Sequence, residues 1–146
     1  MLSRIHHIGV VVRNLEQAYG FWRDTLGLPV HKVATVKDQD VRAALLTVGE
    51  SEIELLQPLS DQSGIGKFLA KRGEGLHHLC FATDDVGAEL EGARDKGTRL
   101  IDKQPRPGLA GMICFLHPAS TRGVLVEYAE PYPPGHPGLP GEEPLP

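Results

Sequence analysis

RIHHIGVVVRNLEQAYGFWRDTLG, residues 4–27, and GLHHLCFATDDVGAELEGARDKG, residues 75–97, are two versions of one pattern. Each opens with paired histidines in an apolar, strand-like run, and each then reaches a polar residue suited to cap a helix, Asn14 or Asp85. The apolar residues that follow have the spacing of one buried helix face, and both stretches end at a glycine. Because histidines, caps and glycines recur at nearly the same interval, we interpret the chain as an internal duplication.

Short runs of apolar and β-branched residues follow each expected helix and predict strands, with glycine, proline and polar residues between them. Each half therefore has the order strand, helix, strand, strand, strand. The predicted fold class is α+β, built from two tandem βαβββ modules. The expected strands after the helices cover residues 29–37, 41–48 and 52–57 in the first half and 98–102, 112–117 and 124–129 in the second.

The expected organisation is one domain over residues 1–130 and a tail. Within the domain, module one covers residues 4–60, a linker helix lies in 61–74, and module two covers 75–130. Residues 131–146 hold seven of the 12 prolines. Because proline donates no backbone hydrogen bond and cannot continue a helix, we expect this tail to be extended or disordered, outside any sheet and away from the functional site.

The composition excludes several classes of protein. The net charge of −4 argues against a general nucleic-acid binder, which would carry a basic stripe. No apolar run reaches the roughly 20 residues of a membrane helix, and the N-terminus does not resemble a signal peptide. Cys80 and Cys114 lie in strand-like runs without metal-ligand spacing, so we expect buried thiols in a reducing cytoplasm.

Four polar residues occupy matching places in the two modules. His7 and His78 lie in the first strands, whereas Gln57 and Glu127 end the last strands. Two imidazoles, an amide oxygen and a carboxylate suit Co²⁺, Ni²⁺, Mn²⁺ or Zn²⁺ better than Ca²⁺ or Mg²⁺. We therefore predict a metal site at these four residues. Strand alternation would turn the neighbouring histidine of each pair, at positions 6 and 77, the other way into structural roles.

The motifs HHIGVVV, ELLQPL, KRGEGLHHL, FLHP and GVLVE, in this order, resemble the methylmalonyl-CoA epimerases of the vicinal oxygen chelate superfamily. The resemblance spans about residues 5–130. It implies paired βαβββ modules whose sheets form an open, barrel-like cleft around a metal, with Co²⁺ as the favoured ion. Carried over by residue, the family's ligands fall on His7, Gln57, His78 and Glu127. The implied protein is a cytoplasmic homodimer that binds an acyl-CoA.

The resemblance also implies an activity: interconversion of (R)- and (S)-methylmalonyl-CoA by α-proton transfer through a metal-stabilised enolate. A metal that chelates the thioester and carboxylate oxygens would stabilise the developing charge, and Glu127 would serve as one base. The second base is missing, because Ala43 stands where bacterial relatives often have glutamate. Bacterial glyoxalase I is similar but generally has glutamate at the second ligand position, so Gln57 favours the epimerase.

Two alternatives remain open from the sequence. Ala43 keeps a lactoylglutathione lyase of the glyoxalase I type, or another metalloenzyme of this superfamily, under consideration. A metal-free small-molecule binding protein would share the scaffold, but the complete set of ligand residues argues against it.

Overall fold

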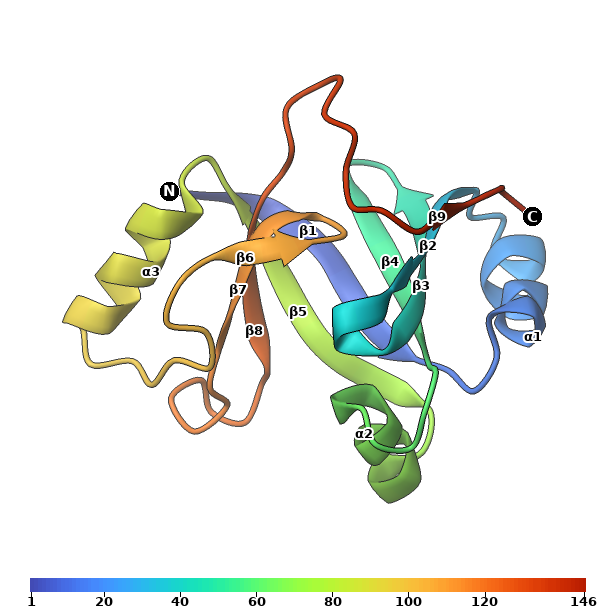
Figure 1. Cartoon of the computed structure of the whole chain (residues 1–146), viewed down its shortest axis with the longest axis horizontal. Helices are drawn as coiled ribbons and strands as arrows, with labels where there is room; N and C mark the ends of the chain where they lie inside the picture. Colours follow the sequence, from blue (N-terminus) through green and yellow to red (C-terminus); the bar gives the residue numbers. More distant parts are fainter. The chain divides into compact units, whose positions relative to one another are not determined.

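The computed structural model describes all 146 residues, which form two compact units. Unit 1 comprises residues 1–7 and 78–139, and unit 2 comprises residues 8–77 and 140–146 (Figure 1). None of the helices is long and apolar enough to span a bilayer. The elements are β1 (Leu2–Val11), α1 (Leu15–Tyr19), the π-helical η1 (Gly20–Thr25), β2 (Val30–Val36), the 3₁₀-helical η2 (Lys37–Gln39), β3 (Val41–Val48), β4 (Ser51–Pro58), α2 (Gly64–Arg72), β5 (Gly75–Thr83), α3 (Val86–Asp95), β6 (Arg106–Gly108), β7 (Gly111–Leu116), β8 (Val126–Glu130) and β9 (Glu142–Glu143).

In unit 2 the strand order is β1-β4-β3-β2-β9, with β2, β3 and β4 joined as antiparallel neighbours. Helix α1 begins where the Asn14 side chain accepts a hydrogen bond from the Gln17 backbone N–H, at 2.9 Å. Alternate strand residues pack under α1 and η1 and bury Leu15 and Tyr19. This face is therefore the hydrophobic core of unit 2. Its buried residues are Val10, Val12, Leu15, Tyr19, Val33, Ala44, Leu46 and Leu55.

In unit 1 the strand order is β6-β7-β8-β5-β1, and β5 pairs with β8 in parallel. Helix α3, capped by the Asp85 side chain, packs on one face of β7 and β8. Leu90 of α3 is buried with Cys114 and Leu116, and Tyr128 packs against them. Residues of opposite parity, such as Glu127, must then lie on the other face of the strands. The predicted α+β fold, with a βαβββ order in both halves, is confirmed.

The second half keeps the predicted βαβββ order, but its second strand lies later in the chain than expected. The strand expected at residues 98–102 is reduced to one isolated bridge, between Leu100 and Leu116, and the short β6 follows it. The reason lies in Asp102, whose side chain accepts the Phe115 backbone N–H at 2.8 Å. The Asp102 carboxylate accepts the N–H that a backbone carbonyl would accept in a regular strand pair. The backbone hydrogen bonding with β7 therefore does not continue.

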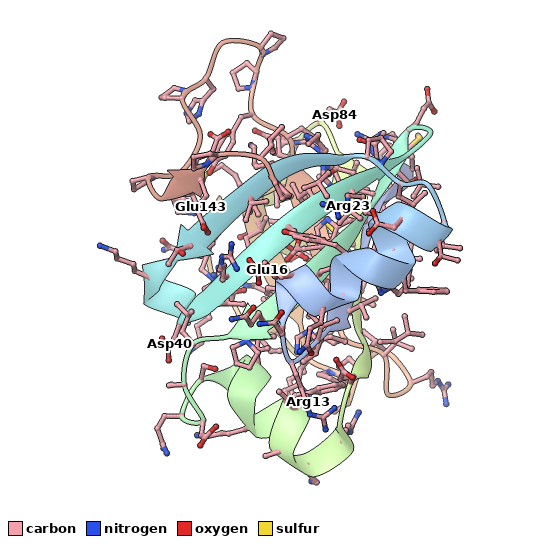
Figure 2. All side chains as sticks on the ribbon, turned by 90° about the vertical axis from the view of Figure 1, so that its right-hand side faces the viewer. Arg13, Glu16, Arg23, Asp40, Asp84 and Glu143 are labelled. Carbon is pink, nitrogen blue, oxygen red and sulfur yellow. The ribbon has the colours of Figure 1, made fainter.

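The tail was expected to stay outside any sheet, and this prediction was wrong. Residues 142–143 form β9, which pairs antiparallel with β2, and the Thr35 N–H donates to the Gly141 carbonyl at 3.0 Å. An edge strand presents unpaired backbone groups, and the stretch between the prolines at 140 and 144 is free to satisfy them. Glu143 also accepts hydrogen bonds from the Arg42 guanidinium at 2.9 and 3.1 Å, and Arg42 further donates to Glu16 of α1 (Figure 2).

Candidate metal centre

Three of the four predicted ligands meet inside unit 1. The Nε2 atoms of His7 and His78 are 2.9 Å apart, and the Oε2 atom of Glu127 lies 3.1 Å from the first and 3.0 Å from the second. The residues are 0%, 7% and 3% exposed, respectively. Side chains from β1, β5 and β8 thus place three potential donor atoms in one buried triangle.

The register of β5 and β8 explains this convergence. Cys80 is the partner of Glu127, so Glu127 shares a face with Cys80 and, by alternation, with His78. This is the face opposite α3, and its apolar members include Ile113 and Ala129. The ring of Phe115, which pairs with Glu127 across β7 and β8, contacts the His78 imidazole edge-on at 5.5 Å. The polar triangle is therefore enclosed by an apolar wall.

Protons alone cannot satisfy the three contacts when both imidazoles are neutral. Each neutral ring has one N–H, and the carboxylate accepts only. If both Nε2 atoms carry the proton, the contact between His7 and His78 is repulsive. If only one Nε2 atom carries a proton, the other directs its lone pair at the carboxylate of Glu127, which also offers only lone pairs. A cation at the centre would satisfy all three lone pairs at once.

The spacing also fits a particular coordination geometry. Two ligands about 2.1 Å from an ion are roughly 3.0 Å apart at an octahedral right angle and roughly 3.4 Å apart in a tetrahedron. The observed separations of 2.9, 3.0 and 3.1 Å match one face of an octahedron. The residues present therefore fit a divalent ion that keeps further positions for other ligands.

Electrostatics supports the same interpretation. Burial by itself would raise the pKa of Glu127, but the charge of His7 and the hydrogen bonds from both histidines outweigh it. The pKa of Glu127 therefore lies well below its ordinary value, and the carboxylate stays ionised at neutral pH. A carboxylate ligand must be ionised to bind a divalent cation, and Glu127 meets this requirement.

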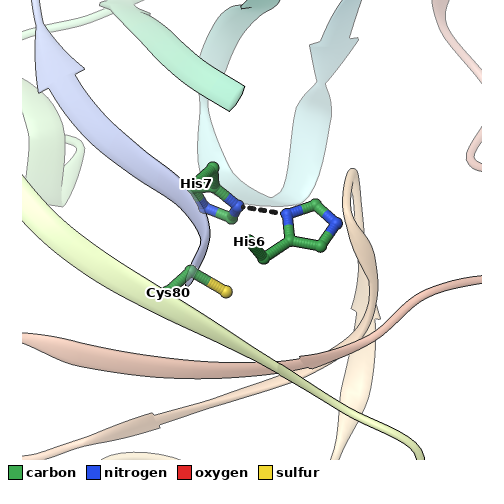
Figure 3. Close-up of side chains that lie close together, drawn as sticks. All are labelled: His6, His7 and Cys80. Atoms are coloured by element: carbon green, nitrogen blue, oxygen red, sulfur yellow. Dashed lines mark hydrogen bonds between the residues drawn. The ribbon is translucent and has the colours of Figure 1, made fainter. Parts of the chain in front are cut away.

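His6 does not lie where strand alternation would put it. It is 4% exposed, and its Nδ1 atom lies 2.9 Å from Nδ1 of His7 (Figure 3). The two rings meet edge to face at 86°, and Cys80 lies beside them. His77 instead follows the prediction, because its ring contacts Phe68 of α2 at 5.0 Å. Sequence reasoning missed the contact because it depends on the ring orientations of two adjacent residues within β1.

Gln57, the remaining predicted ligand, lies in unit 2 with its side chain committed to another role. Its Oε1 atom accepts the backbone N–H of Leu15 at 2.9 Å, at the start of α1. Its partner on β3 is Arg42, which donates to Glu16 of the same helix. Gln57 therefore lies on the face of β4 that α1 covers.

Glu54 lies on the opposite face of β4. It is 8% exposed and pairs with Leu45, while Leu55, the residue after it, packs into the core under α1. Along β1 the residues that pack toward α1 are Ile8 and Val10, so the odd-numbered positions face away from the helix. Alternation thus assigns Glu54 to the face away from α1, and Gln57 to the covered face. The period of two around Leu55 was the signal in the sequence for this distinction.

Comparisons with known proteins agree with the fold. The model of the glyoxalase/bleomycin resistance protein/dioxygenase superfamily matches residues 6–115. The ethylmalonyl-CoA/methylmalonyl-CoA epimerase of Cereibacter sphaeroides is 35% identical over 87% of this chain and 97% of its own. The mitochondrial methylmalonyl-CoA epimerase of Mus musculus is 36% identical over 86% of this chain and 72% of its own.

A solved structure shows the same architecture. A variant of the Streptomyces coelicolor methylmalonyl-CoA epimerase, in complex with 2-nitronate-propionyl-CoA, superimposes with a TM-score of 0.88. The two chains are 40% identical, and the match covers 91% of this chain and 100% of the other. Fold, motif order and the matched residues lead to one assignment. The chain belongs to the glyoxalase/bleomycin resistance protein/dioxygenase superfamily.

Proposed function

We propose that this protein is a methylmalonyl-CoA epimerase, an isomerase that uses a divalent metal ion to interconvert the (R) and (S) forms of an acyl-CoA. The observation that carries the proposal is the buried triangle of His7, His78 and Glu127, at octahedral spacing. Its relatives named as methylmalonyl-CoA epimerases are similar over most of the chain. Solved structures of such epimerases hold methylmalonyl-CoA or an analogue.

We propose that His7, His78 and Glu127 are metal ligands. We further propose that β4 supplies Glu54, and not Gln57, as the fourth ligand. Glu54 is buried, lies on the face of β4 away from α1, and carries a carboxylate. Gln57 already satisfies the N–H of Leu15 and supports the start of α1. When bound, the ion would withdraw electron density from the substrate's thioester carbonyl and so make its α-hydrogen more acidic.

Glu127 is the proposed proton acceptor on one side of the substrate. Its carboxylate is ionised, and its Oε2 atom lies 3.1 and 3.0 Å from the Nε2 atoms of His7 and His78, so its position is set before the substrate arrives. Removing the α-proton leaves a planar enolate, and return of a proton to the opposite face gives the other epimer. The apolar wall around the triangle, which includes Phe115, excludes water and strengthens these electrostatic interactions.

The second proton carrier cannot be residue 43. Ala43 is 1% exposed, pairs with Leu56 and offers no polar atom in its side chain. Glu54 lies on the same face of the sheet as Ala43, diagonally across β3 and β4. We propose that the carboxylate of Glu54 takes the role that a glutamate at position 43 would otherwise have.

A lactoylglutathione lyase of the glyoxalase I type is the second candidate, and one observation favours it. With Glu54 in place of Gln57, the ligands become two histidines and two glutamates. A glutamine ligand then no longer distinguishes this protein from bacterial glyoxalase I, which generally has glutamate at the second ligand position. The curated relatives favour the epimerase, because four of them named so are at least 33% identical to this chain. A metal-free binding protein would not need three converging buried donors.

The finer proposals concern the ion, the assembly and the compartment. Octahedral spacing supports Co²⁺, with Ni²⁺ or Mn²⁺ as substitutes, over tetrahedral Zn²⁺. The resemblance to the epimerases supports a homodimer, which light scattering would test. Two buried free thiols support a reducing cytoplasm, and burial raises the pKa of Cys114 to about 12, which keeps that thiol protonated.

Proton exchange tests the proposed reaction directly. The Co²⁺-loaded protein is incubated with methylmalonyl-CoA in D₂O, and the α-hydrogen is followed by NMR. We expect the α-hydrogen signal to disappear and both epimers to form. If no deuterium enters the substrate although the ion is bound, the epimerase proposal fails. The next substrate to test is then the hemithioacetal of glutathione.

A further inference from the structure

The contact between the Nδ1 atoms of His6 and His7 has a chemical consequence. The atoms are 2.9 Å apart and both residues are buried, at 4% and 0% exposure. Two ring nitrogens at this distance form a hydrogen bond only if one carries a proton and the other offers a lone pair. The bond therefore fixes the tautomers of both rings together.

The metal centre determines which ring donates. His7 directs Nε2 into the triangle with His78 and Glu127. To bind a cation there, Nε2 must carry a lone pair, so the single proton of neutral His7 must reside on Nδ1. Nδ1 of His7 is then the donor and Nδ1 of His6 is the acceptor.

We propose that His6 is a positioning residue, which holds His7 in the tautomer and ring orientation needed for metal binding. The inference rests on the proposed function, because it assumes that His7 is a ligand. Metal-bound histidines generally donate their second N–H to a carboxylate, a carbonyl or water, and loss of such a partner weakens metal binding about 10–100-fold. Here the acceptor is a second imidazole.

Cys80 completes the surroundings of this pair. Its side chain is fully buried, and its Sγ atom lies within 4.8 Å of the histidine nitrogens (Figure 3). The thiol lies beside both rings (Figure 3). The same three atoms could instead bind a soft metal ion, and the experiment separates that outcome from the positioning role.

The duplicated histidine pair provides a matched control. His77 precedes His78 as His6 precedes His7, but its ring contacts Phe68 of α2 instead of the ligand histidine. Replacing His77 therefore changes a residue beside a proposed ligand without changing the contact that carries the inference. An effect confined to His6 would reflect the Nδ1 contact and not proximity to the metal.

The first test measures Co²⁺ affinity by calorimetry in three variants. His6→Leu removes the acceptor, and we expect the affinity to fall about 10–100-fold. His6→Asn places an oxygen close to the position of Nδ1, and we expect it to recover most of that loss. His77→Leu should bind Co²⁺ like the wild type. Equal affinity in His6→Leu and the wild type would overturn the inference while leaving the proposed function intact.

The second test needs no variant and so does not depend on folding. In the Zn²⁺-loaded wild type, ¹H–¹⁵N NMR should show a proton on Nδ1 of His7 and a lone pair on Nδ1 of His6. A proton on Nδ1 of His6 would overturn the inference. So would a second bound ion per chain that is lost in Cys80→Ala. If the wild type binds no divalent ion at all, the proposed function itself fails.

Discussion

Nε2 of His7 and Oε2 of Glu127 lie 3.1 Å apart, although 120 residues separate them in the chain. Nε2 of His78 lies 2.9 Å from the first atom and 3.0 Å from the second. Because all three are buried, their lone pairs require positive charge between them, supplied either by protons or by a cation. Protons and metal therefore compete for the same atoms, and metal binding should release protons.

The most direct prediction concerns the two histidines of β5. His78→Ala removes one corner of the triangle, and we expect Co²⁺ binding to fall at least about 100-fold. His77→Ala should leave binding unchanged, because its ring lies against Phe68. Metal analysis after dialysis measures both variants. Greater damage from His77→Ala would mean that the register of β5 is displaced by one residue.

The depressed pKa of Glu127 predicts an acid-dependent loss of stability in the metal-free protein. Its folded-state pKa lies below the ordinary 4.5, chiefly because the histidines outweigh burial. Its contribution is therefore fully present above the unfolded-state pKa and is lost as the pH falls toward the folded-state pKa. Urea unfolding of EDTA-treated protein between about pH 6 and pH 3 should show a steeper decline for wild type than for Glu127→Gln. Parallel declines would contradict this account.

Replacing Glu127 separates metal binding from proton transfer. Glu127→Gln keeps an oxygen that can act as a ligand but removes the basic carboxylate. We expect some Co²⁺ to remain bound, while the rate of α-proton exchange falls about 10²–10⁴-fold. Comparing bound metal with the exchange rate in the same sample gives the result. Full turnover in this variant would transfer the base role to another residue.

Two variants distinguish Glu54 from Gln57 as the metal ligand of β4, because each should lose a different property. Glu54→Ala should lose metal affinity and turnover, because it removes the carboxylate on the face of β4 away from α1. Gln57→Leu should keep both but lose about 0.5–2 kcal/mol of stability, because the Leu15 N–H loses its acceptor. Denaturant unfolding and metal titration of the two proteins measure these effects. The reverse pattern would restore Gln57 as the ligand.

The sequence predicted the duplicated βαβββ order because its signals are local. Asn14 and Asp85 cap helices as expected, and both halves place a ligand candidate on the first strand. Histidine and carboxylate residues on strands that pair in space then converge, as His78 and Glu127 do. The hydrophobic periodicity and the helix caps, which match between the halves, were enough to predict this order.

The sequence failed where a prediction depended on which face of a strand a residue occupies. The number of residues between Gln57 and Glu127 is close to the number between His7 and His78. A matching interval does not ensure that two residues point to the same face of their strands, because loop lengths differ between the modules. Parity around Leu55, which is buried under α1, assigns Glu54 to the face away from the helix. The contact between His6 and His7 could not be predicted, because it depends on local ring orientation within β1.

The tail yields the last prediction, in which stability and catalysis should separate. Truncation after Leu139 removes β9, the Gly141 contact with Thr35 and the bonds between Glu143 and Arg42. The Arg42–Glu143 pair is partly exposed, so Glu143→Ala alone should cost about 1 kcal/mol or less. The truncation should cost more and should promote aggregation, because it leaves the edge of β2 unpaired. Thermal unfolding and light scattering measure both effects, with Glu142→Ala as the matched control.

Co²⁺ content per folded chain should not change, since His7, His78 and Glu127 are all retained. An unchanged melting temperature would show that β9 contributes nothing to the fold, and a loss of bound Co²⁺ from folded protein would show that the tail supports the metal centre.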